Sequence, residues 1–155
     1  MTTDPGQVSP LWWDASVQGL RAVDLAAFWH GQGLSARVKV YDGPVLAADP
    51  GACIVTSWLP GPGFSFEDMI DTSAVQVRVM GPQKAPGQAW ILADMLDRSL
   101  TRFRWPAMLG GHQVVLIRRA GGRPSQDRVD NAERTHYVCT YLADVAADPG
   151  EATLR

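Results

Sequence analysis

Three residues near the end of the sequence, Ser125, Asp130 and His136, have the side-chain types of a hydrolase triad. In such a triad the histidine takes the serine proton, and the aspartate orients the imidazole ring. A nucleophilic serine on a strand-to-helix turn usually lies between glycines, whereas Ser125 lies between proline and glutamine. These neighbours do not favour a nucleophile, and we predict that the chain is not an enzyme.

Metal and phosphate chemistry is not indicated either, and we expect no cofactor. The three histidines are His30, His112 and His136, and no two have the four-residue spacing that places metal ligands on one helical face. The acidic group Glu67, Asp68 and Asp71 has no histidine beside it, so we interpret it as a solvated loop. Pro62, between two glycines, lacks the backbone N–H that a phosphate-binding loop needs.

Composition is typical of a globular protein, with 46% hydrophobic and 19% charged residues. The formal net charge of -2 gives no reason to expect nucleic acid or anionic lipid as the main partner. Cys53 and Cys139 lie in apolar runs, where we expect buried core residues. The sequence shows no signal peptide, and apolar runs such as Val114–Ile117 are far shorter than a membrane span.

The segment from Arg118 to Arg134 is the strongest candidate for a contact surface. It holds five arginines against three acidic residues, and arginine is favoured at protein interfaces. A polar segment of this length is usually either functional or disordered, so a solvated loop remains the alternative. The polar face of the alternating strand expected at 74–80 is the second candidate surface. The candidate interface residues on the two surfaces are Gln76, Arg78, Arg118, Arg123, Arg128 and Arg134.

Hydrophobic periodicity predicts the elements that would position these residues. We expect helices over about 13–30 and 86–104, and strands over 38–41, 53–58, 74–80, 113–118 and 135–145. The predicted apolar stripes are Val17, Leu20, Val23 and Ala27 in the first helix, and Trp90, Leu92, Met95, Leu96, Ser99, Leu100 and Phe103 in the second. We expect the Pro-Gly-Pro-Gly run at 60–63 to end a strand and to open a loop to Thr72, and Gly81-Pro82 to end the next strand.

The resulting order is α-β-β-β-α-β-β. Two strand-to-strand links are too short for helical crossovers, so we predict an α+β fold with a mainly antiparallel sheet of about five strands covered by two helices. We expect a single domain over 1–155, in which about 11–146 form the folded core and 1–10 and 147–155 are tails.

Three segments resemble the tail terminator proteins of long-tailed bacteriophages, also called tail completion or minor tail proteins. The first is Val75–Gly81 followed by Ala89–Leu96, and the second is the step from Gly110-Gly111 into Val114–Ile117. The third is Gly121–Pro124, a polar loop, and Arg134–Val145. Together they span roughly 15–146, as patterns of strand and turn without a catalytic signature.

The resemblance implies a structural virion protein at the head-proximal end of the tail, present in the host cytoplasm during assembly. Its expected partners are copies of itself in a ring, usually a hexamer, together with the tail tube protein and a head-completion protein. The ring would stop tube polymerisation, and DNA would pass through its lumen without sequence-specific binding. The alternatives are a head-tail connector of the same virion and, less favoured, a small ligand-binding or hydrolase domain.

Overall fold

A computed structural model of the chain describes residues 20–43 and 51–146. In chain order its elements are α1 (Ala22–Gly31), β1 (Lys39–Asp42), β2 (Cys53–Ser65), β3 (Ile70–Gln83), α2 (Pro86–Thr101), β4 (Ala107–Leu109), β5 (His112–Arg119), β6 (Ser125–Val129) and β7 (Arg134–Ala146). The predicted α+β class is confirmed. The described strands number seven, because the sequence patterns did not show β4 and β6.

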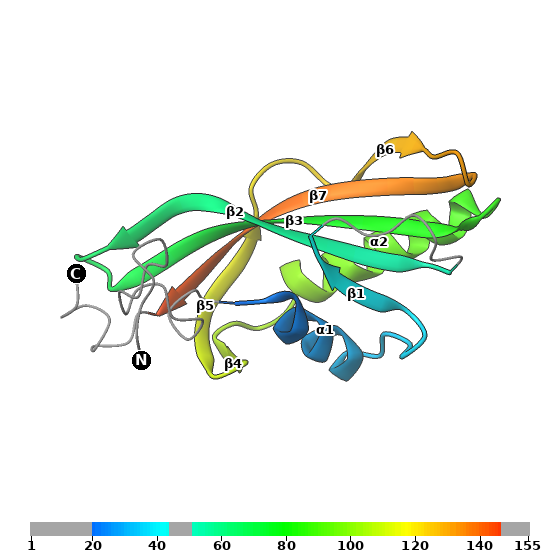
Figure 1. Cartoon of the computed structure of the whole chain (residues 1–155). Helices are drawn as coiled ribbons and strands as arrows, with labels where there is room; N and C mark the ends of the chain where they lie inside the picture. Colours follow the sequence, from blue (N-terminus) through cyan, green and yellow to red (C-terminus); the bar gives the residue numbers. More distant parts are fainter. Residues whose placement is uncertain (1–19, 44–50, 147–155) are drawn as a thin grey trace, which may run out of the picture.

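The strands form a single sheet in the order β1-β2-β3-β7-β5-β4, and β6 pairs with the remaining part of β7. The pairing is antiparallel throughout, except that β1 and β2 run parallel. The parallel pair differs from the prediction, and part of the link that joins its strands lies outside the described residues. Both helices cover the same face of the sheet (Figure 1), where they share one hydrophobic core with it.

β3 confirms the alternation that its sequence predicts. Val75, Val77 and Val79 are buried under α2, whereas Gln76 and Arg78 are half-exposed on the opposite face. Strand residues point alternately to the two faces, so the valines fix β3 to the core, and the polar residues stay on the face that no helix covers. We call this second surface the helix-free face.

α1 is rotated relative to its predicted apolar stripe. Its buried residues are Ala22, Leu25, Phe28 and Trp29, whereas Val23 is 60% exposed. The large aromatic side chains decide this orientation, because Phe28 packs against Phe103 and Trp105 with ring centroids 5.1 and 5.5 Å away. The start of the predicted helix, including Val17, lies outside the described residues.

α2 begins at Pro86 as predicted but ends at Thr101. Its predicted stripe is confirmed in part, because Leu96 and Leu100 are buried. Trp90 and Met95 are 37% and 41% exposed, although both belong to the predicted stripe. The buried positions are Ala89, Ala93, Leu96, Asp97 and Leu100. Small side chains are needed where the helix crosses β3, since a Cβ added to Gly81 would lie 2.5 Å from the Cβ of Ala89.

A buried carboxylate also fixes this face of α2. Asp97 is 1% exposed and accepts a bidentate ion pair from Arg119 of β5. The hydroxyl of Tyr141 on β7 donates to the same carboxylate at 2.8 Å. Burial by itself would raise the pKa of Asp97, but the hydrogen bonds from Arg119 and Tyr141 outweigh it and lower the pKa below its usual value. The helix is therefore tied to two strands of the sheet.

β2 and β3 both continue past the residues at which the sequence predicted that they would end. β2 continues through the Pro-Gly-Pro-Gly run to Ser65, with a register shift between Leu59 and Gly63, and β3 continues through Gly81-Pro82 to Gln83. β1 pairs with only the first four residues of β2, so the prolines lie on an open edge where a missing donor breaks no ladder bond. The bulge accommodates the extra residues.

The contact between Gly81 and Ala89 gives a first prediction. We expect Gly81→Ala to lower the free energy of unfolding by about 2 kcal/mol, because the new methyl group overlaps the helix. The double variant Gly81→Ala with Ala89→Gly should recover most of this loss. Urea unfolding followed by circular dichroism measures both variants. Equal losses in the single and double variants would show that α2 does not approach β3 as described.

Candidate functional site

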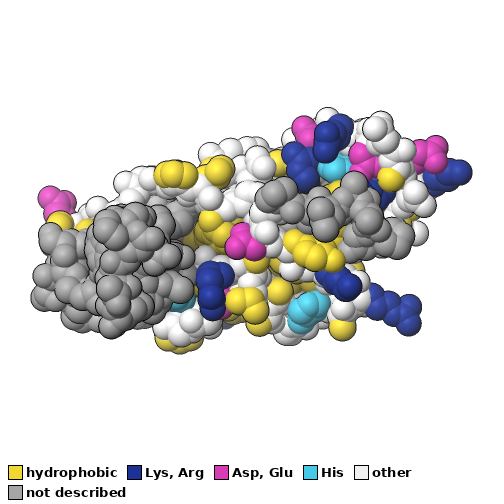
Figure 2. Space-filling view, in the orientation of Figure 1, with side chains coloured by type: hydrophobic (Ala, Val, Ile, Leu, Met, Phe, Trp, Pro, Cys, Tyr) yellow, Lys and Arg dark blue, Asp and Glu magenta, His cyan; other side chains and the backbone are white. Residues whose placement is uncertain are grey.

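The helix-free face carries most of the polar residues that the sequence analysis selected, except Arg123, which lies near Asp94 of α2. Its cross-strand neighbours form rows, such as Ser57, Gln76 and Thr140 on β2, β3 and β7. Figure 2 shows Lys, Arg, Asp and Glu side chains gathered at the end of the molecule where β6 lies, and acidic side chains at the far end of the β2–β3 hairpin. The candidate site is therefore a surface and not a cleft.

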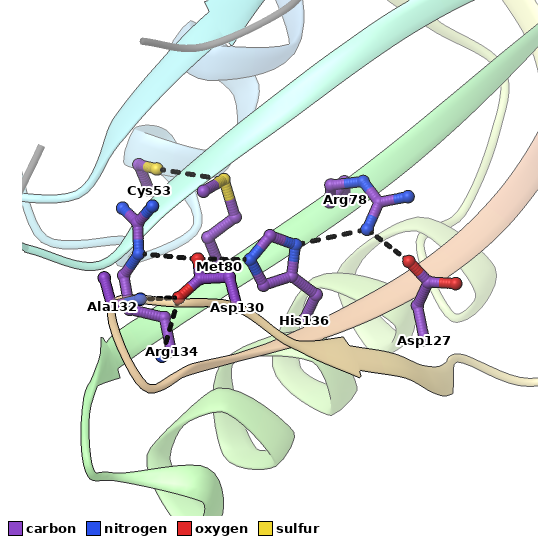
Figure 3. Close-up of polar contacts among 8 residues, drawn as sticks. All are labelled: Cys53, Arg78, Met80, Asp127, Asp130, Ala132, Arg134 and His136. Carbon is purple, nitrogen blue, oxygen red and sulfur yellow. Dashed lines mark hydrogen bonds and ion pairs between the residues drawn. The ribbon is translucent and has the colours of Figure 1, made fainter. Parts of the chain in front are cut away.

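A network of charged residues holds β6 and the β6–β7 turn on this face (Figure 3). Its centre is Asp130, whose carboxylate accepts from the backbone N–H of Ala132 and of Arg134 at 2.9 and 3.0 Å. The same carboxylate accepts from Nε of Arg134 at 3.0 Å and from Nε2 of His136 at 2.8 Å. All of its acceptor positions are used, as a buried carboxylate requires.

The partners of His136 assign the donor and acceptor roles of its two ring nitrogens. Arg78 always carries its protons, so its NH1 group donates to Nδ1 of His136 at 3.2 Å, and Nε2 carries the proton that it donates to Asp130. Arg78 also binds Asp127 of β6 at 2.6 Å. Ser125 lies opposite Val138, and neither nitrogen of His136 is left to accept its proton. Ser125, Asp130 and His136 therefore do not form a catalytic triad.

Three of the other four candidate arginines are also paired within the chain. Arg118 binds Asp144, which accepts a second bond from Thr72 at 2.6 Å, and exposed Arg123 lies 3.8 Å from Asp94. Arg134 has a side chain that is only 3% exposed. Its role is inside the network, and we leave it out of the proposed interface. Arg128 is exposed and has no ion pair within 20–43 and 51–146.

Sequence reasoning found the arginines but not their partners. Asp127 of β6 and Asp144 of β7 reach their arginines only when the strands pair, whereas Asp130 binds Arg134 four residues further along the chain. The predicted loop over 118–134 contains β6, whose five residues are all exposed. A strand that buries no side chain gives no hydrophobic alternation, so the pattern that revealed β3 was absent here.

The structure also places the cysteines and the acidic group that the sequence analysis considered. Cys53 and Cys139 are buried and are not joined in a disulfide, as predicted for core residues. Glu67 and Asp68 lie exposed at the β2–β3 turn, whereas Asp71 belongs to β3. The described residues contain no group of three histidine, cysteine, aspartate or glutamate side chains placed to hold a metal. Within those residues, no helix has the length and apolarity to cross a membrane.

The network makes the stability of this end of the sheet depend on pH. Burial acts to raise the pKa of Asp130, but the bonds from His136 and Arg134 outweigh it and hold the pKa well below its usual range. A carboxylate with a lowered pKa stabilises the fold above its ordinary pKa, near 4, and this contribution is lost as the pH falls further.

We therefore expect Asp130→Asn to lower the free energy of unfolding at pH 7 by about 3 kcal/mol. The loss should shrink as the pH falls below about 4, because the carboxyl of the unfolded wild-type chain then takes up a proton, whereas the folded carboxylate does so only at lower pH. Glu133→Gln, in the same turn but exposed, is the matched control and should change stability little. Urea unfolding at several pH values makes the comparison, and a loss independent of pH would exclude the charged network as its cause.

The chain has a weak structural likeness to known proteins. No protein-family model and no curated protein matches the sequence. Among solved structures, the chain is similar to a chain described as "Virion of native gene transfer agent (GTA) particle", with 19% sequence identity over 88% of each chain and a TM-score of 0.49. A likeness at this level does not by itself assign a function.

Proposed function

We propose that the chain is a structural virion protein, a tail terminator that forms a ring on the tail tube of a long-tailed phage. The ring stops tube polymerisation and joins the tail to the head-completion protein. Support comes from the three segments of resemblance, which correspond to β3 with α2, to β5, and to β7 with the turn before β6. These segments make up most of the sheet and one of its two covering helices.

The observation that carries the proposal is the helix-free face with its neutralised charges. Arg78, Arg118 and Arg134 each bind an aspartate of the same chain. Proteins that bind DNA tightly do so by offering unpaired cations to its phosphates. A ring through which DNA moves without being held needs few unpaired cations. Arginines that are already bound to carboxylates meet this requirement.

Ring formation requires two different surfaces of one chain that fit each other. Such a head-to-tail contact closes into a ring when its rotation closes, and otherwise gives an open filament. Among the candidate residues, Gln76, Arg78, Arg118, Arg123 and Arg128 have accessible side chains for this contact. We expect the ring to be a hexamer.

The function is tested by growing tail tubes in vitro from the tube protein of the same phage. We expect addition of the purified chain to shorten the tubes and to leave a ring of constant mass at one end. Electron microscopy measures tube length, and native mass spectrometry measures the ring. Tubes of unchanged length without a terminal ring would contradict the terminator function. Rescue of a phage that lacks its connector, but not of one that lacks its terminator, would identify a head-tail connector.

A further inference from the structure

The outer part of the β2–β3 hairpin carries only negative charge. The chain from Leu59 to Ala74, which includes the turn between β2 and β3, contains three acidic residues and no lysine or arginine. At this turn Glu67 and Asp68 are exposed, and Phe66 is 62% exposed. We call Phe66, Glu67 and Asp68 the acidic tip. An exposed aromatic ring beside two carboxylates is suited to a contact with an apolar and basic surface.

A surface of that kind lies at the other end of the sheet, on β6. Arg128 is exposed and has no ion pair among the residues that the structure describes, while its neighbour Val129 is 56% exposed. Among the strands that the structure describes, β6 pairs with β7 alone, which leaves the second edge of its backbone for further pairing. We call Arg128 and Val129 the β6 edge. The neighbouring Asp127 forms its ion pair with Arg78 and attracts Arg128 only through space.

The two surfaces are too far apart to meet within one chain. Ile70, just after the acidic tip, lies opposite Ala146 of β7, whereas Ser125 of β6 lies opposite Val138. Eight residues of extended strand separate these two positions on β7, a distance of about 26 Å at 3.3 Å per residue. Figure 1 shows the two elements at opposite ends of the molecule. Only another chain can bring an acidic tip to the β6 edge.

We propose that the acidic tip of one copy binds the β6 edge of the next copy. Glu67 and Asp68 face Arg128 in this contact, and Phe66 packs against Val129. The inference rests on the proposed ring and names the surfaces that join its subunits. The two surfaces differ and lie at opposite ends, so each copy offers one of each, as a head-to-tail assembly requires. Opposite charge at the two ends also disfavours contacts between two tips or between two β6 edges.

Disulfide trapping between separate copies tests the contact while leaving its charges unchanged. One preparation carries Phe66→Cys and the other carries Val129→Cys, and the two are mixed under mild oxidation, alone and with tube ends. We expect the mixed disulfide to exceed either homodimer at least fivefold on non-reducing gels. Cys53 and Cys139 are buried, so the wild-type chain serves as the background control. A mixed disulfide no more abundant than the homodimers would overturn the proposal.

Charge reversal then tests whether the carboxylates and Arg128 cause the pairing. Arg128→Glu in the Val129→Cys chain should lower the mixed disulfide at least fivefold, and Glu67→Arg with Asp68→Arg in the other chain should restore it. Arg102→Glu is the matched control, because Arg102 is an exposed arginine at the end of α2 and should have no effect. An unchanged yield with Arg128→Glu would also overturn the proposal, as would a disulfide formed to the tube protein in place of the second copy.

The results separate this contact from the proposed function. Tubes capped by the wild-type chain, without the mixed disulfide, would remove the contact and leave the terminator function. The mixed disulfide in a chain that caps no tube would support the contact and contradict the terminator function.

Discussion

A buried carboxylate, that of Asp97, determines how the two layers of this protein fit together. A charge inside a hydrophobic core is stable only with its bonds satisfied, and here the guanidinium of Arg119 and the hydroxyl of Tyr141 satisfy it. These partners lie on two different strands, so α2 can bury Asp97 in only one orientation. That orientation leaves Trp90 and Met95 at the surface, although their apolar side chains would otherwise favour the core.

The same principle organises the helix-free face. Asp130 gathers bonds from residues within six positions of it, whereas Asp144 gathers bonds from Thr72 and Arg118, which are far apart in the sequence. Each of the two carboxylates neutralises an arginine. His136 continues the first network to Arg78 and Asp127, so that β3, β6 and β7 are joined by side chains as well as by backbone pairing. Residues whose types could serve catalysis, such as Asp130 and His136, thus bind structural partners. The function is therefore assigned to the accessible surface.

The sequence predicts the elements whose burial alternates and does not predict those whose burial is irregular. The valines of β3 and the proline that begins α2 were sufficient for these two elements. The faces of both helices were predicted only in part. The periodicity counted Val23 and Trp90 as core, whereas aromatic packing around Phe28 and the pairing of Asp97 decide the orientation. β6 was missed because it buries nothing. The candidate arginines were visible in the sequence, but their neutralisation depends on strand pairing that residue spacing does not reveal.

The bulge in β2 allows the outer part of the β2–β3 hairpin to vary in length independently of the inner part, which a regular hairpin does not allow. Between Leu59 and Gly63, three residues of β2 stand opposite one residue of β3, so the outer part of the hairpin is joined to the inner part by a local excess of chain. Insertions or deletions at this point change how far the turn reaches, while β3 keeps its pairing with β7. Homologous chains can therefore differ in hairpin length here and still share the same core, which leaves the reach of the hairpin open to evolutionary adjustment.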